Sequence, residues 1–249
     1  MLNRNVVLRT GICAILLLAV VFCVAGCKKS APQPAPEPPE PAPPNAGDKT
    51  GRVPIPLELP KPMFVGTPSN IEGVTNLEKP LGKDRPAFYA PSGTTNVAAG
   101  KSVSGSDEEP VYGELAMITD GDKEATDGSY VDLAPFLQNV TIDLEAEHEI
   151  YAIVVWHYHK QSRVYFDVIV QLSNDPDFIE STTVFNNDID NSAGMGIGGD
   201  MHYVETNEGK LIDAKGGRGR YVRLYSNGNN NNDLNHYIEV QVFGKALSN

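Results

Sequence analysis

The most chemically varied stretch of the sequence runs from Trp156 to Tyr165 and holds the single tryptophan, two histidines and an arginine. His157 and His159 would point to one face of a strand, an arrangement open to a transition metal, although no third ligand is evident. These residue types also suit sugar binding, because aromatic rings stack on a sugar and planar side chains donate hydrogen bonds to its hydroxyls. We expect a sugar-binding rim here, with a solvated hairpin tip as the alternative. Its residues would be Tyr158, His159, Arg163 and Tyr165.

The segment from Ser226 to His236 is a second candidate binding region because it is rich in asparagine. A side-chain amide carries paired donors and acceptors that match neighbouring sugar hydroxyls. Asparagine also favours turns, and a plain turn is the alternative for any single residue here. The candidate ligand residues of this segment are Asn227, Asn229 and His236.

No catalytic motif accompanies these residues. The sequence contains no nucleophile elbow, P-loop or H-E-x-x-H pattern, and its three cysteines all lie at positions 13 to 27. Acidic residues are numerous enough to supply a glycosidase carboxylate pair, which stays open as an alternative. We predict a binding protein and not an enzyme.

An acidic, glycine-rich segment from Asp188 to Asp200 partly resembles a cation-binding loop. It lacks glycine at the sixth loop position and has Gly199 where an EF-hand places its glutamate. Its glycines also satisfy the G-x-G-x-x-G pattern, but no βαβ unit surrounds them, which argues against dinucleotide binding. We interpret the segment as a flexible surface loop, with a bound cation as the alternative.

The elements that would position all these residues are β-strands. Apolar and polar residues alternate in Val140–Leu144, Tyr221–Tyr225 and Ile238–Val242. Two denser apolar runs, Ile150–Trp156 and Phe166–Leu172, are rich in β-branched residues and typical of central strands buried on both faces. Trp156 is in phase with the apolar side chains of its run, so it should pack in the core. No dozen-residue stretch carries a helical stripe, and the sequence predicts an all-β sandwich or jelly roll.

Five sequence motifs occur in the order in which discoidin-like domains carry them. On these motifs the chain resembles that family, the galactose-binding-like jelly roll of coagulation factor C-type domains and many bacterial carbohydrate-binding modules. The resemblance implies a discoidin-like jelly-roll β-sandwich over residues 96–246, with a ligand at loops on one end of the barrel. It also implies that Arg220 and Arg223 support the fold. The motifs are Asn96–Val103, Ile118–Asp122, Val140–Leu144, Arg220–Leu224 and Ile238–Gly244.

The same resemblance implies a structural calcium ion. The segment from Asp120 to Thr126 is similar to the calcium loop of carbohydrate-binding discoidin-like modules, where a glutamate on the last strand completes the shell. Calcium prefers such oxygen ligands. The family's tryptophan shortly after the threonine is missing here, and Tyr130 is the nearest aromatic residue. An Asp-Gly turn beside an edge glutamate is the alternative. The implied ligands are Asp120, Asp122, Thr126 and Glu239.

The N-terminal region predicts export and anchoring. Arg4 and Arg9 precede an apolar run that is too short for a typical membrane span. The run ends in Val24-Ala25-Gly26-Cys27, which resembles the lipobox of bacterial lipoproteins. The resemblance implies a signal peptide over residues 1–26 and an acylated Cys27 that anchors the protein to the lipid bilayer. An uncleaved anchor helix is the alternative. Lys28 favours the outer membrane if the cell has two membranes.

Residues 27–62 contain the lipidated cysteine and a proline-rich linker that would act as an extended spacer. Residues 63–95 form a lead-in segment to the domain. The formal net charge of -12 argues against nucleic acid or anionic lipid as a partner. We predict a surface-displayed, non-catalytic module for carbohydrate in the cell envelope. The alternative is a protein-interaction or envelope-scaffolding domain without a sugar pocket, whose partner is an envelope or extracellular protein.

Overall fold

The computed structural model describes residues 51–63 and 71–247. The predicted signal peptide, Cys27 and the first part of the linker lie outside the described residues. In the described ranges, no helix has the length and apolar character needed to cross a bilayer.

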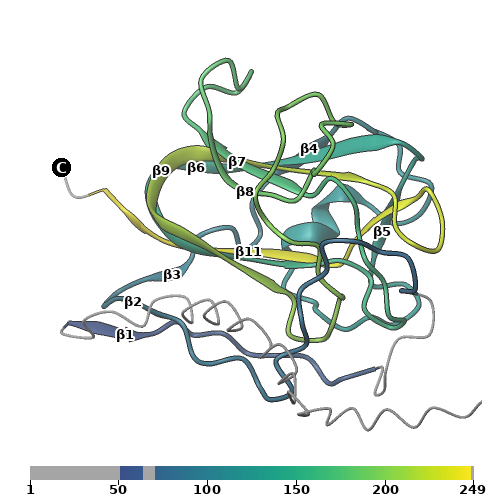
Figure 1. Cartoon of the computed structure of the whole chain (residues 1–249). Coiled ribbons are helices and arrows are strands. Elements are labelled where there is room, and N and C mark those ends of the chain that lie inside the picture. Colours follow the sequence, from purple (N-terminus) through teal and green to yellow (C-terminus); the bar gives the residue numbers. More distant parts are fainter. Residues whose placement is uncertain (1–50, 64–70, 248–249) are drawn as a thin grey trace, which may run out of the picture. The chain divides into compact units, whose positions relative to one another are not determined.

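Two long antiparallel strands organise the fold, β6 (Leu137–Trp156) and β9 (Lys210–Asn227). Their pairing register shifts between Asp143 and His148, and the pair curves back on itself, as Figure 1 shows for β6 and β9. Glu145 lies in this shift with a φ of 69°, a left-handed conformation that turns the chain within the strand. β6 and β9 therefore contribute to both layers of the fold.

The curve divides one sheet into two layers. In one layer, the first half of β6 pairs with β4 (Val103–Gly105), and the second half of β9 pairs with β7 (Ile169–Ser173), which pairs with β8 (Thr182–Asn186). In the other layer, the second half of β6 pairs with β11 (Glu239–Ala246), which pairs with β3 (Thr95–Asn96). All these pairings are antiparallel, so the predicted all-β sandwich is confirmed.

Shorter elements complete the domain. β5 (Val131–Leu133) pairs with β10 (Asn235–Tyr237), and a 3-10 helix, η1, spans Leu115–Thr119. β1 (Arg52–Pro54) pairs with β2 (Tyr89–Pro91). The range predicted as linker thus contains a paired strand, because Arg52–Pro54 finds a partner in the lead-in segment.

Apolar side chains that alternate along the strands meet between the two layers, as the period-two pattern predicts. Burying them supplies the main driving force for folding, because the described residues contain no disulfide-forming cysteine. The core joins residues of both layers, among them Val140, Ile142, Ile153, Val155, Leu224 and Val242.

A second apolar cluster surrounds Trp156, with Val154 and Phe88 among its members. The prediction that Trp156 packs in the core is confirmed, and its Nε1 donates a hydrogen bond to the Asn207 carbonyl at 2.9 Å. Gly209 approaches the indole closely. A Cβ at this position would lie 2.8 Å from the ring, and its φ of +63° also favours glycine.

Arg220 and Arg223 connect β9 to β6 beside the curve, which agrees with a role in the fold. Arg220 donates to both carboxylate oxygens of Asp143 at 2.8 Å, and these bonds hold the pKa of that carboxyl below its usual value. Arg223 donates to the hydroxyl of Thr141 at 2.8 Å. Both guanidinium groups are therefore used within the sandwich.

Candidate functional site

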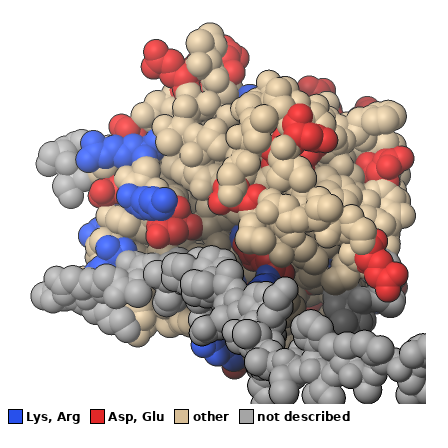
Figure 2. All heavy atoms as spheres, viewed as in Figure 1, with Lys and Arg blue, Asp and Glu red and all other residues tan. Residues whose placement is uncertain are grey.

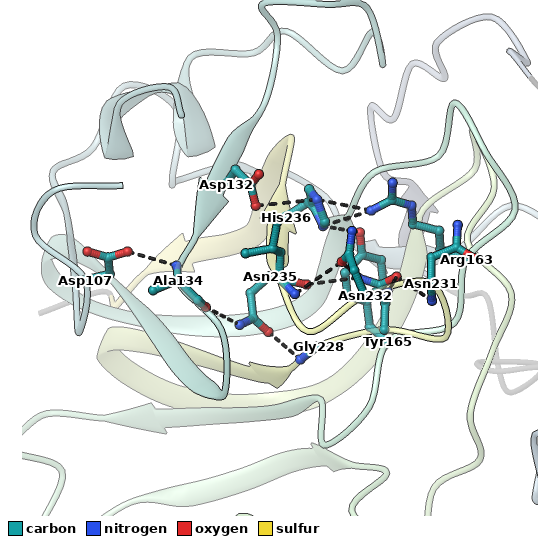
Figure 3. A network of polar contacts seen from close by, with 12 residues as sticks. Asp107, Asp132, Ala134, Arg163, Tyr165, Gly228, Asn231, Asn232, Asn235 and His236 are labelled. Atoms are coloured by element: carbon teal, nitrogen blue, oxygen red, sulfur yellow. Dashed lines mark hydrogen bonds and ion pairs between the residues drawn. The ribbon is translucent and has the colours of Figure 1, made fainter. Parts of the chain in front are cut away.

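The pairing of β5 with β10 creates the centre of the candidate site by placing His236 opposite Asp132, with 3.4 Å between His236 Nε2 and Asp132 Oδ1. The loop that follows β6 brings Arg163 to the same point, with its Nη1 3.1 Å from the ring nitrogens of His236. The hydroxyl of Tyr165 lies 3.0 Å from His236 Nδ1. Figure 3 shows these side chains converging from three separate segments. Three of the predicted ligand residues are thus brought together.

Burial sets the electrostatics of this centre. Removal from water raises the pKa of Asp132 to about 6, although Arg163 opposes the shift. Burial and then the charge of Arg163 lower the pKa of His236 to about 3, so the ring is neutral and can accept a hydrogen bond from the guanidinium. The site therefore contains the positively charged guanidinium of Arg163, which is held by the neutral imidazole of His236.

A row of aromatic rings leads from Arg163 to the surface. The guanidinium carbon lies 4.6 Å from the centroid of the Tyr158 ring. The Tyr158 ring lies 5.0 Å from that of Tyr130, which lies 5.0 Å from that of Tyr112. Tyr112 is 45% exposed. We call Tyr112, Tyr130 and Tyr158 the tyrosine row.

An exposed ion pair stands beside this row. Lys160 Nζ donates to Asp127 Oδ1 at 2.7 Å. Burial raises the pKa of Tyr130, and the charge of Asp127 adds a smaller effect in the same direction. The hydrogen bond with Asp127 raises the pKa of Lys160, and Tyr158 adds a smaller effect. Hydrogen-bonding groups and aromatic faces are therefore adjacent on the surface.

The expected exposed rim is wrong in one respect, because most of its residues are buried. Tyr158 and Arg163 are each 8% exposed, and Tyr165 is fully buried. The cause is that the loop after β6 packs on the asparagine-rich loop, where Tyr165 forms a β-bridge with Asn229 and the Val164 backbone N–H donates to Asn230 Oδ1. Two loops that hold each other in this way leave Lys160 and Gln161 as the solvent-accessible part of this segment.

Three predicted residues point elsewhere. Asn229 is buried and donates to the Leu234 carbonyl, which folds its own loop. Asn227 donates to Asp167 Oδ2 at 2.8 Å. His159 donates from Nε2 to the Lys123 carbonyl at 3.0 Å. The fold uses each of these side chains to fix a loop.

The two histidines considered for a transition metal lie in different environments. His157 Nδ1 lies 2.7 Å from Glu205 Oε1, and its ring stacks on Tyr165 at 4.3 Å. His159 contacts the loop of Lys123. Across residues 51–63 and 71–247, the metal-compatible group of His, Cys, Asp and Glu side chains includes neither histidine.

Glu239 is the most informative member of the implied calcium set. It is fully buried at the start of β11, and its Oε2 accepts a hydrogen bond from the Gly121 N–H at 3.1 Å. Burial raises its pKa to about 8, and the charge of Asp120 acts in the same direction. A buried carboxyl whose ionisation is opposed by burial and by the charge of Asp120, beside a glycine turn, fits a cation. Glu239 and Asp120 would hold it.

The other two implied ligands make local hydrogen bonds. Asp122 Oδ1 accepts from the Glu124 N–H at 2.9 Å, and the Thr126 hydroxyl lies 3.0 Å from that of Ser129. Both side chains are exposed. They belong to the same loop as Asp120, and the metal-compatible group of His, Cys, Asp and Glu side chains in residues 51–63 and 71–247 does not include Asp120, Asp122 or Glu239.

Sequence reasoning missed Tyr112 and Asp132 as functional candidates and gave Tyr130 no ligand role. The signal for two of them was present: in Tyr130-Val131-Asp132-Leu133, polar and apolar residues alternate, and Val131 and Leu133 are buried. Tyr112 joins them only through a bridge to Asp132, which no local pattern predicts.

The strands define an antiparallel β-sandwich, and several solved structures are similar to part of this chain. No protein-family model and no curated protein matches the chain. Among solved structures, a family 89 glycoside hydrolase from Clostridium perfringens is 20% identical over 61% of this chain and 15% of that chain, with a TM-score of 0.46. This chain thus corresponds to a small part of that enzyme.

Two other similar structures are covered almost completely. The CBM32 of AlyQ, in complex with 4,5-unsaturated mannuronic acid, is 19% identical over 57% of this chain and 93% of that chain, with a TM-score of 0.43. A fucose-binding module from Streptococcus pneumoniae is 18% identical over 59% of this chain and 96% of that chain, with a TM-score of 0.42. Likenesses of this size carry no argument about a ligand.

Proposed function

We propose that this protein is an exported, lipid-anchored, non-catalytic module of the discoidin-like type that binds carbohydrate at the tyrosine row. The observation that carries the proposal is the contact between the exposed ring of Tyr112 and the ring of Tyr130, 5.0 Å apart, beside the ion pair of Lys160 and Asp127. Sugar recognition needs an apolar face together with oriented polar groups. This surface provides both.

Arg163 and His236 support the tyrosine row from its buried side. The guanidinium packs on Tyr158 and is itself held by His236, so the Tyr158 ring contacts both the guanidinium and the Tyr130 ring. They are positioning residues, because burial keeps them from the surface. A preorganised row reduces the entropy lost when a sugar binds.

The row is a surface and not a deep pocket, which determines the expected affinity. Each hydroxyl of a sugar must exchange water for protein, and only a few such bonds can form on an open face. We expect dissociation constants from micromolar to millimolar, or roughly 4 to 8 kcal/mol. A polysaccharide that presents many copies of its sugar would raise the effective affinity.

Charge supports an uncharged or weakly charged polysaccharide over nucleic acid. The net charge is -12. On the face in Figure 2, Asp and Glu side chains are spread over the surface, whereas Lys and Arg side chains gather toward one side. A phosphate backbone would be repelled by most of such a surface.

The proposal includes a structural calcium ion at Asp120, Asp122, Thr126 and Glu239. The buried Glu239 carboxylate beside Asp120 supports it, since a cation would offset the cost of two nearby negative charges. The ion would stabilise the loop from Asp120 to Thr126, where it meets β11. It would take no part in any reaction.

Attachment to the membrane through Cys27 is the remaining part of the proposal. The lipobox-like sequence and the apolar run before it support acylation, and Lys28 favours the outer membrane in a cell with two membranes. Proline-rich residues after Cys27 would lift the domain from the bilayer.

A glycan array tests the proposal. The purified full chain in detergent micelles should bind at least one class of glycan, and Tyr112→Ala should weaken that binding about tenfold. Ile179→Ala removes a side chain that is 85% exposed in the β7–β8 loop and serves as the matched control. If no glycan binds at high protein concentration, the carbohydrate proposal fails and an envelope-scaffolding role takes its place.

A further inference from the structure

Three aspartates from two loops lie together outside the site described so far. Asp167 precedes β7, and Asp188 and Asp190 follow β8. One carboxylate oxygen of each lies within 4.8 Å of the other two. Ligands on opposite sides of a calcium ion, with bonds of roughly 2.3–2.6 Å, are about 5 Å apart. The spacing therefore suits a single ion.

Hydrogen bonds hold two of these carboxylates in place. Asp188 is fully buried and accepts backbone N–H groups from Ser192 at 3.1 Å and Ala193 at 3.0 Å. Asp167 is also buried, and its Oδ2 accepts from Asn227 Nδ2 at 2.8 Å. Because the oxygens are already positioned, binding of an ion would require little ordering of the chain.

A pocket of about 370 Å³ opens beside the aspartates, and Asp167, Asp190, Asn227 and His202 are among its lining residues. His202 provides an observation that is independent of the carboxylates. Its side chain belongs to a residue that is only 4% exposed, and within the described part of the chain its Nδ1 has no hydrogen-bond partner. A buried polar atom without a partner costs free energy, which a ligand in the pocket would recover.

The imidazole of His202 is electrostatically linked to the carboxylates. Burial lowers its pKa, and the charges of Asp167 and Asp190 oppose this shift. The ring also packs against that of Phe166 in a T-shaped contact, with centroids 5.4 Å apart at 88°. The ring is therefore packed in place and lines the same pocket as Asp167 and Asp190.

We propose that Asp167, Asp188 and Asp190 bind one divalent cation, and that His202 contacts this ion or a water molecule bound to it. Three carboxylates form a hard oxygen donor set, which suits calcium or manganese. The pocket leaves room for water to complete the coordination. The loop from Asp188 lacks an EF-hand pattern by itself, and Asp167 supplies the ligand that the loop does not contain.

This proposal does not depend on carbohydrate binding, and its ligands include none of the residues proposed around Glu239. The two cation sites can therefore be separated by mutation. Glu239→Gln removes the first site and leaves the three aspartates unchanged. Asp190→Asn removes one charge from the second site at an exposed position. Asp190 Oδ1 accepts a hydrogen bond from the Ser192 N–H at 3.0 Å, and the asparagine side-chain oxygen can still accept it.

Calorimetric titration of the full chain in detergent with calcium, magnesium or manganese chloride gives the test. In the Glu239→Gln background we expect one site, and adding Asp190→Asn should weaken it at least tenfold. Asp177→Asn changes an exposed aspartate in the β7–β8 loop and should leave affinity within twofold. Binding that disappears with Glu239→Gln alone, or that is unchanged by Asp190→Asn, overturns the proposal. The first of these outcomes would still support the ion at Glu239.

Proton NMR with substoichiometric manganese provides a second readout. The paramagnetic ion should broaden the ring signals of His202 before those of His148, because His148 pairs with Gly219 far along β9 from Asn227. Loss of this selectivity in the Asp190→Asn variant would locate the ion at the aspartates. Equal broadening of both histidines in the parent protein would show that the ion binds elsewhere.

Discussion

The guanidinium carbon of Arg163 lies 4.6 Å from the centroid of the Tyr158 ring, and each residue is 8% exposed. A cation packed on an aromatic face away from water is worth up to about 2 kcal/mol. This pair is therefore part of the structure that supports the tyrosine row.

Arg163→Ala should lower the melting temperature because it removes one hydrogen-bond donor to His236 and opens a gap beneath Tyr158. We expect a loss of about 2 kcal/mol, or roughly 4–8 °C for a chain of this size. Differential scanning fluorimetry measures the shift. Arg218→Ala, at an exposed position on β9, is the control and should change the melting temperature little. Equal effects of the two variants would contradict a supporting role for Arg163.

Tyr112→Ala should separate binding from stability. The ring is 45% exposed and contacts that of Tyr130 at a tilt of 33°, so its loss should cost about 1 kcal/mol of sugar binding and leave the melting temperature within a degree or two. Titration with a glycan selected from the array measures the affinity. Tyr112→Phe keeps the ring and should bind nearly as well as the parent. A parent-like affinity for the alanine variant would place the ligand elsewhere.

Asp132→Asn should stabilise the protein above pH 6 relative to the parent. The folded-state pKa of about 6 lies above the usual value of 3.8, so the folded protein favours the protonated carboxyl, and this contribution to stability is lost as pH rises from about 4 to about 6. An amide cannot ionise and avoids that loss. The difference in melting temperature, variant minus parent, should increase between pH 4.5 and pH 7. His236 titrates in both proteins and largely cancels. A pH-independent difference would contradict burial as the cause.

Calcium should raise the melting temperature through Glu239. A ligand at a hundredfold excess over its dissociation constant adds about 2.7 kcal/mol to the folded state. The measurement uses the Asp190→Asn background, so that the aspartate cluster does not contribute. The increment between chelator and calcium should disappear with Glu239→Gln and persist with Glu180→Gln, which changes an exposed glutamate. An increment that survives Glu239→Gln would remove this residue from the calcium site.

Cys27→Ser should prevent lipidation. In bacterial lipoproteins, which this segment resembles, the diacyl group is attached to a cysteine thiol. The variant should therefore lose labelling by a palmitate analogue, and it should either leave the membrane fraction or accumulate as precursor. Cys23→Ser changes a thiol within the same apolar run and should be labelled normally. Normal labelling of Cys27→Ser would contradict the lipoprotein proposal.

Local alternation predicted the strands well but not their continuity. Val140 and Ile142 fall on the buried face, as the period of two requires. The sequence predicts separate strands at Val140–Leu144 and Ile150–Trp156, yet β6 continues from one to the other, because β9 curves alongside and the register shift absorbs the extra residues. A strand that bends with its partner can only be recognised from the pairing of both.

The functional residues depend even more on distant pairings. Asp132 meets His236 because β5 pairs with β10, and Asp167 joins Asp188 because the Asn187 N–H donates to the Val168 carbonyl at 3.1 Å. Residue type suggested that Arg163 and His236 were important, but their burial follows from contacts between loops that are far apart in the sequence. Composition contains no information about such contacts.

The position of β11 has a consequence for the order of folding. This strand, at residues 239–246, lies between β3 and β6, although β3 precedes it by more than a hundred residues. The layer cannot close until β11 has been synthesised, so the edges of β3 and β6 that pair with it stay unpaired until then. Loop closure over such separations is slow. In a nascent chain, this layer would therefore stay open until β11 has been synthesised.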